Sequence, residues 1–274
     1  MNIFHAFILG VIQGLTEFIP VSSTAHLLIG QEILKIPSNE QIFAFLVIIQ
    51  TGTILSLLIY FRNDLWKIVI SFFKNLNHVN EFNSMPLDAR LGWYIILATI
   101  PALIGGYYLR DALEKIFTQP FLGASIRLIT ASLIMFLGEF LGKSTRRFES
   151  INWKDGLFIG LMQIIAVFPG ASRSGTTISA GLMRKLDRPS AARFAFLISI
   201  PVMLAAGGYE IIKLLGTGDI SNILPAIIIG FITSAVVGWF AVRWLLGFLN
   251  KHSLVPFGIY CLILGLVCLT ITFF

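Results

Sequence analysis

The sequence predicts an all-α polytopic membrane protein that forms a single membrane domain over residues 1–274. Hydrophobic residues make up 56% of the chain and charged residues 12%, and the mean hydropathy is +0.85. A soluble fold could not cover so much apolar surface, whereas a lipid bilayer can. The Lys and Arg residues that give the chain its net charge of +6 lie mostly between the apolar runs, as they do in membrane proteins. The positive charge therefore does not indicate binding to nucleic acid.

A second observation is an internal repeat at an offset of 150 residues. Residues 10–26 read GVIQGLTEFIPVSSTAH, and residues 160–176 read GLMQIIAVFPGASRSGT. Aligned without a gap, the two stretches share Gly10 with Gly160, Gln13 with Gln163, Phe18 with Phe168, and Ser22 with Ser172. We therefore expect two related halves: repeat 1 at about 1–141 and repeat 2 at about 156–274, joined by a basic cytoplasmic loop at 142–155.

Repeat 1 opens with two apolar segments, 3–19 and 24–36, that are too short to span a bilayer. Pro20 and the polar residues after it interrupt them. We interpret 3–36 as a re-entrant helix pair, because irregular backbone inside a membrane must be buried in protein or line a wet cavity. Full spans are expected at 41–61, 91–109 and 121–141. Between them we expect a polar loop at 62–90, with an interfacial helix at 64–76, and a short loop at 110–120.

Repeat 2 follows the same order. A second broken pair is expected at 156–168 and 173–186, around Pro169-Gly170. Three spans follow, at about 191–212, 222–245 and 254–273. Because each half contributes three spans, an odd number, the second half should enter the membrane upside down. Such an inverted-topology repeat places its ligand site at the broken helices.

The distribution of Lys and Arg orients the chain. Fourteen of these residues fall on one side of the expected spans and four on the other, namely Lys35, Arg110, Lys115 and Lys213. The basic side should be cytoplasmic, which puts both termini outside. The first basic residue is Lys35, so we expect no cleavable signal peptide. Cys261 and Cys268 lie in the last apolar run and should be small core residues.

Glu17 is an ionisable group at membrane depth, which by default indicates a functional site. Gln13 precedes it by four residues, so on a helix the two share a face. A buried carboxylate needs a compensating partner, such as a divalent cation or an arginine. The structural alternative is a neutral Glu17 hydrogen-bonded within its helix. Gln50-Thr51 lies in the middle of a span and either lines the same cavity or joins two helices by hydrogen bonds.

The segment after Pro20 reads Ser22-Ser23-Thr24-Ala25-His26. Ser22 should cap the next helix, whose unpaired N–H groups and dipole form an anion site. Ser23 and His26 share a helix face, and a hydroxyl beside an imidazole suits a nucleophile and a proton shuttle. The alternative is that the serines only cap the helix and that His26 hydrogen-bonds a carbonyl.

The second broken pair carries a glycine- and serine-rich turn in which Gly170 and Gly175 allow a ligand to approach the backbone. Ser172 should cap a helix that begins near Arg173, which makes a second anion-binding N-terminus. The planar guanidinium of Arg173 can grip phosphate oxygens. Its structural alternative is an ion pair with a buried carboxylate. The turn lacks the spacing of a Walker A loop.

Together, QGLTEFIPVSSTAH and PGASRSGTT resemble the paired motifs of the bacterial undecaprenyl-diphosphate phosphatase family, the bacitracin-resistance type, and the likeness extends across essentially the whole chain. The resemblance implies a bacterial plasma-membrane enzyme whose substrate is a prenyl diphosphate lipid. Such an enzyme removes the terminal phosphate and recycles the lipid carrier for peptidoglycan synthesis. The resemblance also implies a divalent cation, Mg²⁺ or Ca²⁺, and an active site open to the outer face.

The family's proposed catalytic set corresponds here to Glu17, Ser23, His26 and Arg173, with Glu17 also a metal ligand. Where the family's acidic motif begins with Glu or Gln, this chain has Gln13, so Glu17 is the only carboxylate of the motif. The predicted phosphate-binding residues are Gln13, Ser22, Thr24, Ser172, Ser174, Gly175 and Thr177.

Two mechanisms and two classes of function fit the sequence. Ser23 could attack phosphorus and form a phosphoserine, with Glu17 or His26 accepting its proton, or metal-bound water could attack directly. An inverted-repeat transporter or flippase for a lipid phosphate or a small anion is the second class. The Ser23 and His26 pair favours chemistry, because transport needs no nucleophile. Nothing in the sequence indicates an oligomeric state.

Overall fold

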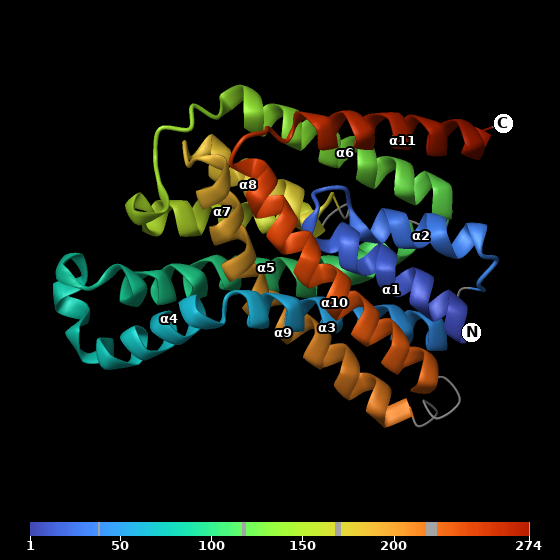
Figure 1. Ribbon diagram of the computed structural model, residues 1–274, viewed down its shortest axis with the longest axis horizontal. Helices are drawn as coiled ribbons and strands as arrows, with labels where there is room; N and C mark the ends of the chain where they lie inside the picture. Colours follow the sequence, from blue (N-terminus) through green and yellow to red (C-terminus); the bar gives the residue numbers. More distant parts are fainter. Residues whose placement is uncertain (38, 117–118, 168–170, 218–223, 274) are drawn as a thin grey trace.

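The structure is a computed structural model, which describes residues 1–37, 39–116, 119–167, 171–217 and 224–273. In these ranges the regular elements are helical, apart from one isolated bridge between Arg146 and Leu186. The long helices run alongside one another, and both termini lie at the same end of the molecule (Figure 1).

Six helices of the described ranges are long and apolar enough to cross a bilayer. They are α3 (Glu40–Tyr60), α5 (Leu87–Ile116), α6 (Pro120–Leu141), α9 (Arg188–Thr217), α10 (Leu224–Leu249) and α11 (Val255–Phe273). Each coincides with one of the six predicted spans, and Pro101 and Pro201 lie inside α5 and α9 without ending them. The all-α, multi-pass membrane fold predicted from the sequence is confirmed.

Four shorter helices form the two broken pairs. They are α1 (Ile3–Phe18), α2 (Ser23–Ile33), α7 (Trp153–Val167) and α8 (Arg173–Met183). The longest, α1, has 16 residues and is therefore about 24 Å long, which is short of the hydrocarbon core of about 30 Å. The second helix of each pair has 11 residues and begins at matched positions of the repeat. The inverted orientation of the halves remains a prediction.

The two broken pairs also share unusual backbone geometry. Ser22 and Ser172 have φ values of 68° and 56°, and Lys35 and Lys185 have φ values of 53° and 66°. Each couple is separated by the 150-residue offset of the sequence repeat. Left-handed backbone is uncommon for residues other than glycine. Its recurrence at matched positions means that the two pairs enter and leave their second helices in the same way.

Glycines let each broken pair pack closely against a span from the other half. A Cβ atom added to Gly10 in α1 would lie 2.8 Å from the carbonyl oxygen of Gly230 in α10. A Cβ atom added to Gly160 in α7 would lie 2.6 Å from the carbonyl oxygen of Ala98 in α5. Any larger residue would push these helices apart, as at other close helix contacts in membranes. The α1–α10 and α5–α7 contacts therefore interlock the halves.

Some predicted boundaries were wrong. The expected loop at 110–120 is helical as far as Ile116, because residues 109–116 contain no Gly or Pro and mostly good helix formers. The helix expected at 64–76 is α4 (Arg62–Lys74), and a 3₁₀ segment, η1 (Leu76–Ser84), occupies much of the remaining loop. The predicted Pro169-Gly170 turn, and the predicted helix ends at 168 and 222, lie outside the described residues.

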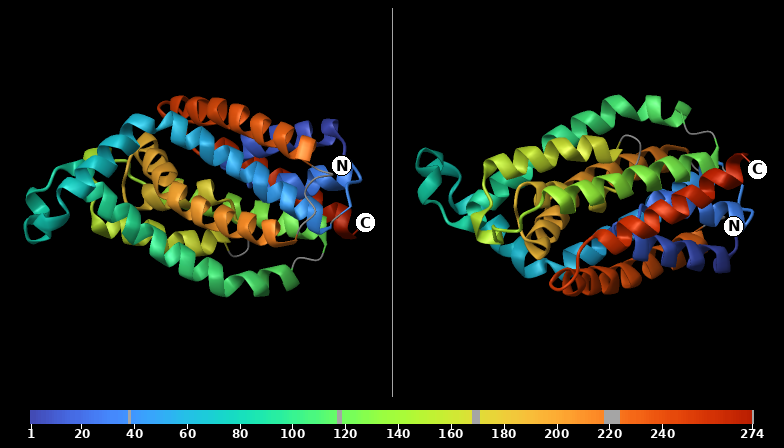
Figure 2. Two further views of the ribbon diagram at one scale, coloured as in Figure 1. Left: turned by 90° about the horizontal axis from the view of Figure 1, so that it is seen from below. Right: turned by 90° about the horizontal axis from the view of Figure 1, so that it is seen from above.

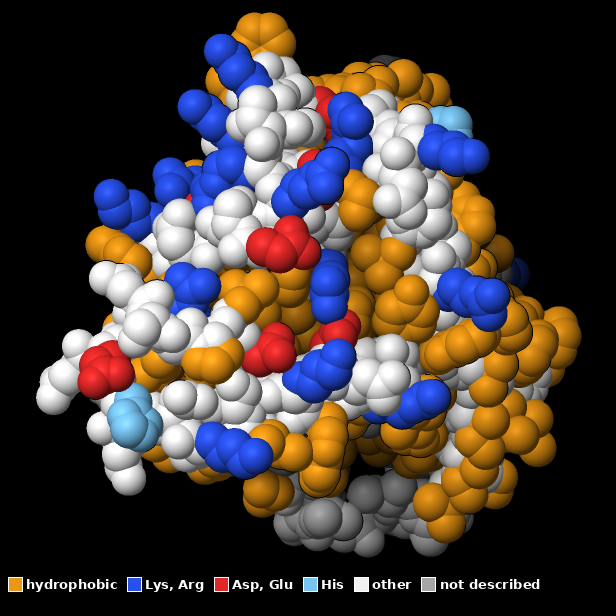
Figure 3. Space-filling view, turned by 60° about the vertical axis from the view of Figure 1, so that its left-hand side comes forward, with side chains coloured by type: hydrophobic (Ala, Val, Ile, Leu, Met, Phe, Trp, Pro, Cys, Tyr) orange, Lys and Arg blue, Asp and Glu red, His pale blue; other side chains and the backbone are white. Residues whose placement is uncertain are grey.

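The segment from α4 to the start of α5 projects beyond the other helices (Figure 2). Lys and Arg side chains are spread over this end of the molecule, which lies away from both termini (Figures 1 and 3). Here the side chain of Asp155, at the start of α7, is fully buried between two arginines. Its oxygens lie 2.6 Å from Arg146 and 2.8 Å from Arg184. These ion pairs tie the 142–155 loop to the end of α8, and η2 (Phe148–Ser150) lies within that loop.

Candidate active site

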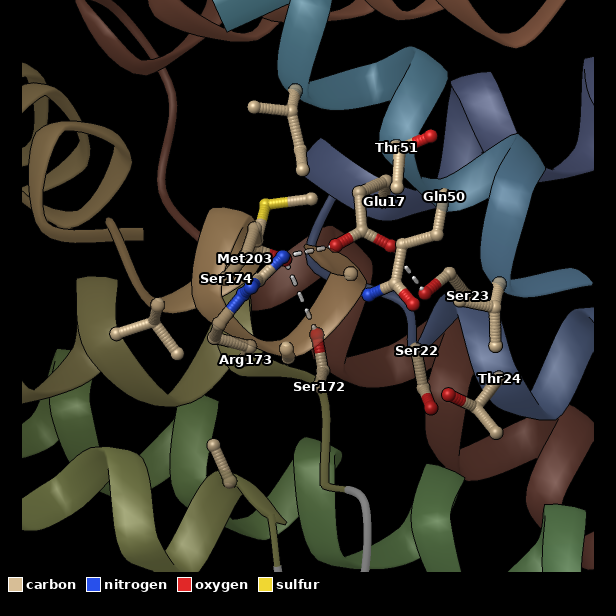
Figure 4. A pocket seen from close by; sticks show the side chains of 16 residues that line it. Glu17, Ser22, Ser23, Thr24, Gln50, Thr51, Ser172, Arg173, Ser174 and Met203 are labelled. Carbon is tan, nitrogen blue, oxygen red and sulfur yellow. Dashed lines mark hydrogen bonds and ion pairs between the residues drawn. The ribbon is translucent and has the colours of Figure 1, made fainter. Parts of the chain in front are cut away.

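A cavity of about 260 Å³ lies where the N-termini of α2 and α8 meet (Figure 4). Its walls come from both halves of the chain, and α3 and α9 supply most of the apolar surface. Gln50 and Thr51 line it, which confirms the first of the two roles considered for that dipeptide. The polar lining consists of Glu17, Ser22, Ser23, Thr24, Gln50, Thr51, Ser172, Arg173 and Ser174.

The carboxylate of Glu17 is the centre of the polar network. Its side chain is 4% exposed, and its Oε1 forms an ion pair with Nη2 of Arg173. Its Oε2 accepts hydrogen bonds from Nε2 of Gln13 and Oγ of Ser23, both at 2.8 Å. Arginine is thus the partner of this buried carboxylate, and the contact joins the two broken pairs across 156 positions of the chain. The contact between Arg173 and Glu17 is also the ion pair with a buried carboxylate that was the structural alternative for Arg173.

The two helix N-termini differ in their caps. Oγ of Ser172 accepts a hydrogen bond from the backbone N–H of Gly175 at 3.2 Å, so the predicted cap of α8 is confirmed. Ser22 occupies the N-cap position of α2, as expected, but its side chain makes no capping hydrogen bond and lies on the cavity wall instead. The predicted capping bond of Ser22 was therefore wrong. The unpaired N–H groups of both first turns favour an anion between them.

His26 does not hydrogen-bond to Ser23. Its Nδ1 lies 3.0 Å from the carbonyl oxygen of Ser22, and its Nε2 lies 2.8 Å from Oη of Tyr260. A carbonyl oxygen can only accept, so Nδ1 carries the proton, and Nε2 of the neutral ring accepts from the Tyr260 hydroxyl. The two rings are also stacked, with centroids 5.7 Å apart.

The predicted pairing of Ser23 with His26 is thus not the arrangement found. Both lie on one helix face, but the charged carboxylate of Glu17 is a stronger acceptor for the Ser23 hydroxyl than an imidazole is. The carbonyl-bonded alternative describes His26 correctly. Its proposed part in catalysis stays a prediction.

Other predicted residues lie at different distances from the cavity. Thr24 and Ser174 line it, whereas Gln13 lines an adjoining groove. Gly175 and Thr177 are buried in α8 and are not among the lining residues described. The hydroxyl of Thr177 donates to the carbonyl oxygen of Arg173 at 2.7 Å and so supports the first turn of α8. Direct phosphate contacts by Gly175 and Thr177 remain predictions.

The sequence did not point to several residues near the site. Tyr260 carries no local signal beyond being a tyrosine in an apolar span, yet it is a partner of His26. The residues of α9 that line the cavity are apolar, so in the sequence they look like any other part of a membrane span. A groove of about 420 Å³ continues from Ser23 to Asn39 between α2 and α3. Its apolar lining consists of Leu27, Leu28, Ile42, Phe43, Leu46 and Val47.

The donor set of the cavity suits a hard cation only in part. Among the described residues there is no cluster of three or more His, Cys, Asp or Glu side chains that could hold a metal ion. The carboxylate of Glu17, the serine hydroxyls and the amide of Gln50 are oxygen donors of the kind that Mg²⁺ and Ca²⁺ prefer. Mg²⁺ commonly binds through one or two carboxylates together with substrate phosphates. Glu17 therefore fits a site that a phosphorylated ligand completes.

Fold and cavity together define a multi-pass membrane protein with a buried, charged site between two broken helix pairs. The model of the family described as "Bacitracin resistance protein BacA" matches residues 6–267, and the chain belongs to this family. The family resemblance predicted from the motifs is confirmed.

Three relatives illustrate the likeness. The undecaprenyl-diphosphatase of Myxococcus xanthus (strain DK1622) is 38% identical over 271 residues, which cover 99% of this chain and 89% of the relative. The undecaprenyl-diphosphatase of Chloroherpeton thalassium is 38% identical over 281 residues and covers 98% and 96% of the two chains. Undecaprenyl-diphosphatase 1 of Corynebacterium jeikeium is 38% identical over 276 residues, with coverage of 99% and 95%. This chain is similar to each of them along nearly its whole length.

Proposed function

We propose that the chain is a membrane phosphatase that hydrolyses undecaprenyl diphosphate to undecaprenyl phosphate and phosphate. The observation that carries the proposal is the contact of Ser23 and Arg173 with one buried carboxylate, Glu17, inside a cavity flanked by two helix N-termini. Relatives that match nearly the whole chain are named for this reaction. The reaction recycles the lipid carrier for peptidoglycan synthesis and accounts for bacitracin resistance.

Substrate binding would rearrange the ion pair. A diphosphate between α2 and α8 meets the unpaired N–H groups of both helices and the guanidinium of Arg173, which can hold two phosphate oxygens at once. The phosphate then competes with Glu17 for Arg173. Binding of the substrate therefore releases Oε1 of Glu17 from the guanidinium, while Ser23 still donates to Oε2.

Ser23 is the proposed nucleophile. Its hydroxyl already donates to Oε2 of Glu17 at 2.8 Å, within the reach expected for a nucleophile and its base. The oxygen attacks the terminal phosphorus, the proton moves to Glu17, and undecaprenyl phosphate leaves. Arg173 and the helix N-termini stabilise charge on the transferring group. Water then attacks the phosphoserine and releases phosphate from Ser23.

A divalent cation, Mg²⁺ or Ca²⁺, is part of the proposal. Glu17 and the phosphate oxygens would hold it, with hydroxyl or amide oxygens of the cavity as further donors. When bound, the cation neutralises charge on the diphosphate. Direct attack by water, with Glu17 as base, is the alternative route and needs no phosphoserine.

The prenyl chain of the substrate would lie in the groove between α2 and α3. This groove shares Ser23, Thr24, Val47 and Gln50 with the cavity, and six of its twelve lining residues are aliphatic or aromatic. A polar site joined to an apolar groove suits a lipid with a phosphorylated end. A small hydrophilic anion would not need an apolar groove in order to bind.

We also propose that the halves have inverted topology, that both termini are outside and that the cavity opens to the outer face. The basic end lies opposite the termini, and the groove leads toward Asn39 at the N-terminal end of α3. Single cysteines at Asn39 and Ser144, after replacement of the buried Cys261 and Cys268, test this orientation in intact cells. An impermeant reagent should label position 39 and spare position 144. The reverse labelling would refute the orientation.

The function itself is tested by phosphate release from the purified protein in detergent. A prenyl diphosphate should be hydrolysed, and EDTA should abolish the reaction. No gradient exists in detergent micelles, so a transporter or flippase without hydrolytic activity would release no phosphate. Absence of phosphate release from a folded protein supplied with Mg²⁺ or Ca²⁺ would refute the phosphatase.

A further inference from the structure

A second hollow, of about 440 Å³, lies on the outer surface of the C-terminal part of α10. None of its lining residues also lines the candidate active-site cavity or the adjoining groove. We call it the α10 pocket. Its lining residues are Phe240, Arg243, Trp244, Gly247, Phe248, Lys251 and His252.

The α10 pocket carries basic groups that no acid neutralises. Arg243 and Lys251 are exposed, and neither has an ion-pair partner among the described residues. The guanidinium of Arg243 lies over the ring of Trp239 at 5.5 Å, and the ring of His252 is stacked on Phe248 at 4.5 Å. These ring contacts leave the polar hydrogens of Arg243 available to a ligand. No Asp or Glu lines the pocket.

The shape of the pocket depends on Gly247. A Cβ atom added there would meet nothing within 4 Å, so the missing side chain leaves open space above the helix. Phe240 and Trp244 lie on the same face of α10, about three and two turns before Lys251, and are 59% and 50% exposed. Apolar surface thus leads into a basic hollow.

Ordinary effects explain the charge but not the hollow. Basic residues favour the C-terminus of a helix because of its dipole, and they snorkel to the membrane surface. Neither effect requires an open hollow bordered by aromatic side chains. Anionic lipids, by contrast, attract basic groups at a membrane surface by about 1 kcal/mol for each Lys or Arg.

We propose that the α10 pocket binds the phosphate group of an anionic phospholipid in the leaflet at the basic end of the molecule. Arg243, Lys251 and His252 contact the phosphate, and an acyl chain follows Phe240 and Trp244 along α10. The ligand chemistry is a phosphate ester joined to an apolar chain. This binding is independent of hydrolysis at the Glu17 site.

The test measures lipid binding to the delipidated protein by native mass spectrometry. The probes are phosphatidylglycerol, phosphatidylcholine with the same acyl chains, and glycerol 3-phosphate as the soluble phosphate ester. The variants are the double change Arg243→Gln with Lys251→Gln, and Gly247→Leu, which fills the hollow and keeps every charge. Lys143→Gln is the control, because it removes an exposed charge from the basic 142–155 loop. Melting temperature and phosphate release verify that each variant is folded.

The wild type should bind phosphatidylglycerol about thirtyfold more tightly than phosphatidylcholine, as expected if two charges each contribute slightly more than fivefold. The double variant should weaken phosphatidylglycerol binding by about thirtyfold on the same basis, and Lys143→Gln by less than about twofold. Gly247→Leu should remove the preference although its charges remain. Equal binding of the two lipids, or wild-type binding by Gly247→Leu, would overturn the site. Equally tight binding of glycerol 3-phosphate would overturn the assignment to a lipid.

Discussion

Replacing Ser23 by alanine removes one oxygen atom, and the geometry predicts how much activity should be lost. That oxygen donates a 2.8 Å hydrogen bond to the carboxylate of Glu17. A hydrogen bond to a charged group contributes about 1.5–3 kcal/mol, so a merely positioning role for Ser23 would cost roughly tenfold to a hundredfold in rate. Loss of the attacking atom should cost more. We expect Ser23→Ala to retain less than about one-thousandth of wild-type turnover, since each 1.36 kcal/mol is tenfold.

The assay is phosphate release from a prenyl diphosphate at saturating substrate, with substrate binding measured separately. Ser22→Ala is the matched control, because Ser22 is the adjacent serine on the same cavity wall. It should retain more than about a tenth of turnover, as expected for the loss of one neutral hydrogen bond. Rapid acid quenching should also trap a phosphoserine at position 23. Turnover of Ser23→Ala above about one-hundredth of wild type, at unchanged melting temperature, would refute Ser23 as nucleophile and favour attack by water.

Three further outcomes are expected. Arg173→Lys should lose most kcat/KM while the protein still folds, because lysine keeps the charge but lacks the planar fork; near-normal turnover would mean that Arg173 acts as a point charge. Tyr260→Phe removes the donor to Nε2 of His26 and should change the pH profile of turnover if His26 acts in the reaction. An unchanged profile would mean that the contact between His26 and Tyr260 is only structural. Asp155→Asn should lower the melting temperature, since breaking a buried ion pair costs about 3–5 kcal/mol. Burial opposes the charge of Asp155, but hydrogen bonds from its two arginines outweigh it and hold its pKa below the ordinary value. Its stabilisation is therefore present above about pH 4 and is lost as the pH falls through the lowered folded pKa. The melting temperature of the wild type should fall over that acidic range, and that of Asp155→Asn should fall less.

The spans and the broken pairs could be predicted because their causes are local. An apolar run either reaches the length of a bilayer or does not, and the interruption at Pro20 is visible within a few residues. Boundaries were less certain, because helix propensity beyond the apolar run carries α5 on to Ile116. The polar residues of the two motifs were also visible, since ionisable groups are rare inside such runs.

The partners of those residues were decided by the tertiary structure. Sequence spacing placed Ser23 beside His26, but the approach of the α8 N-terminus to the first broken pair brings Arg173 and Ser23 to the same carboxylate of Glu17. His26 is turned instead toward Tyr260, which lies 234 positions away in the chain.

The sequence by itself therefore determined the membrane fold, the repeated broken helices and the residues that carry charge at membrane depth. Only the tertiary structure decided which side chains pair, where the groove beside α3 runs and that Gly247 leaves a hollow beside basic residues. The physical reason is that burial of an apolar run depends on its own composition. A hydrogen bond, by contrast, depends on the strongest acceptor within reach, and cavity shape depends on which helices meet.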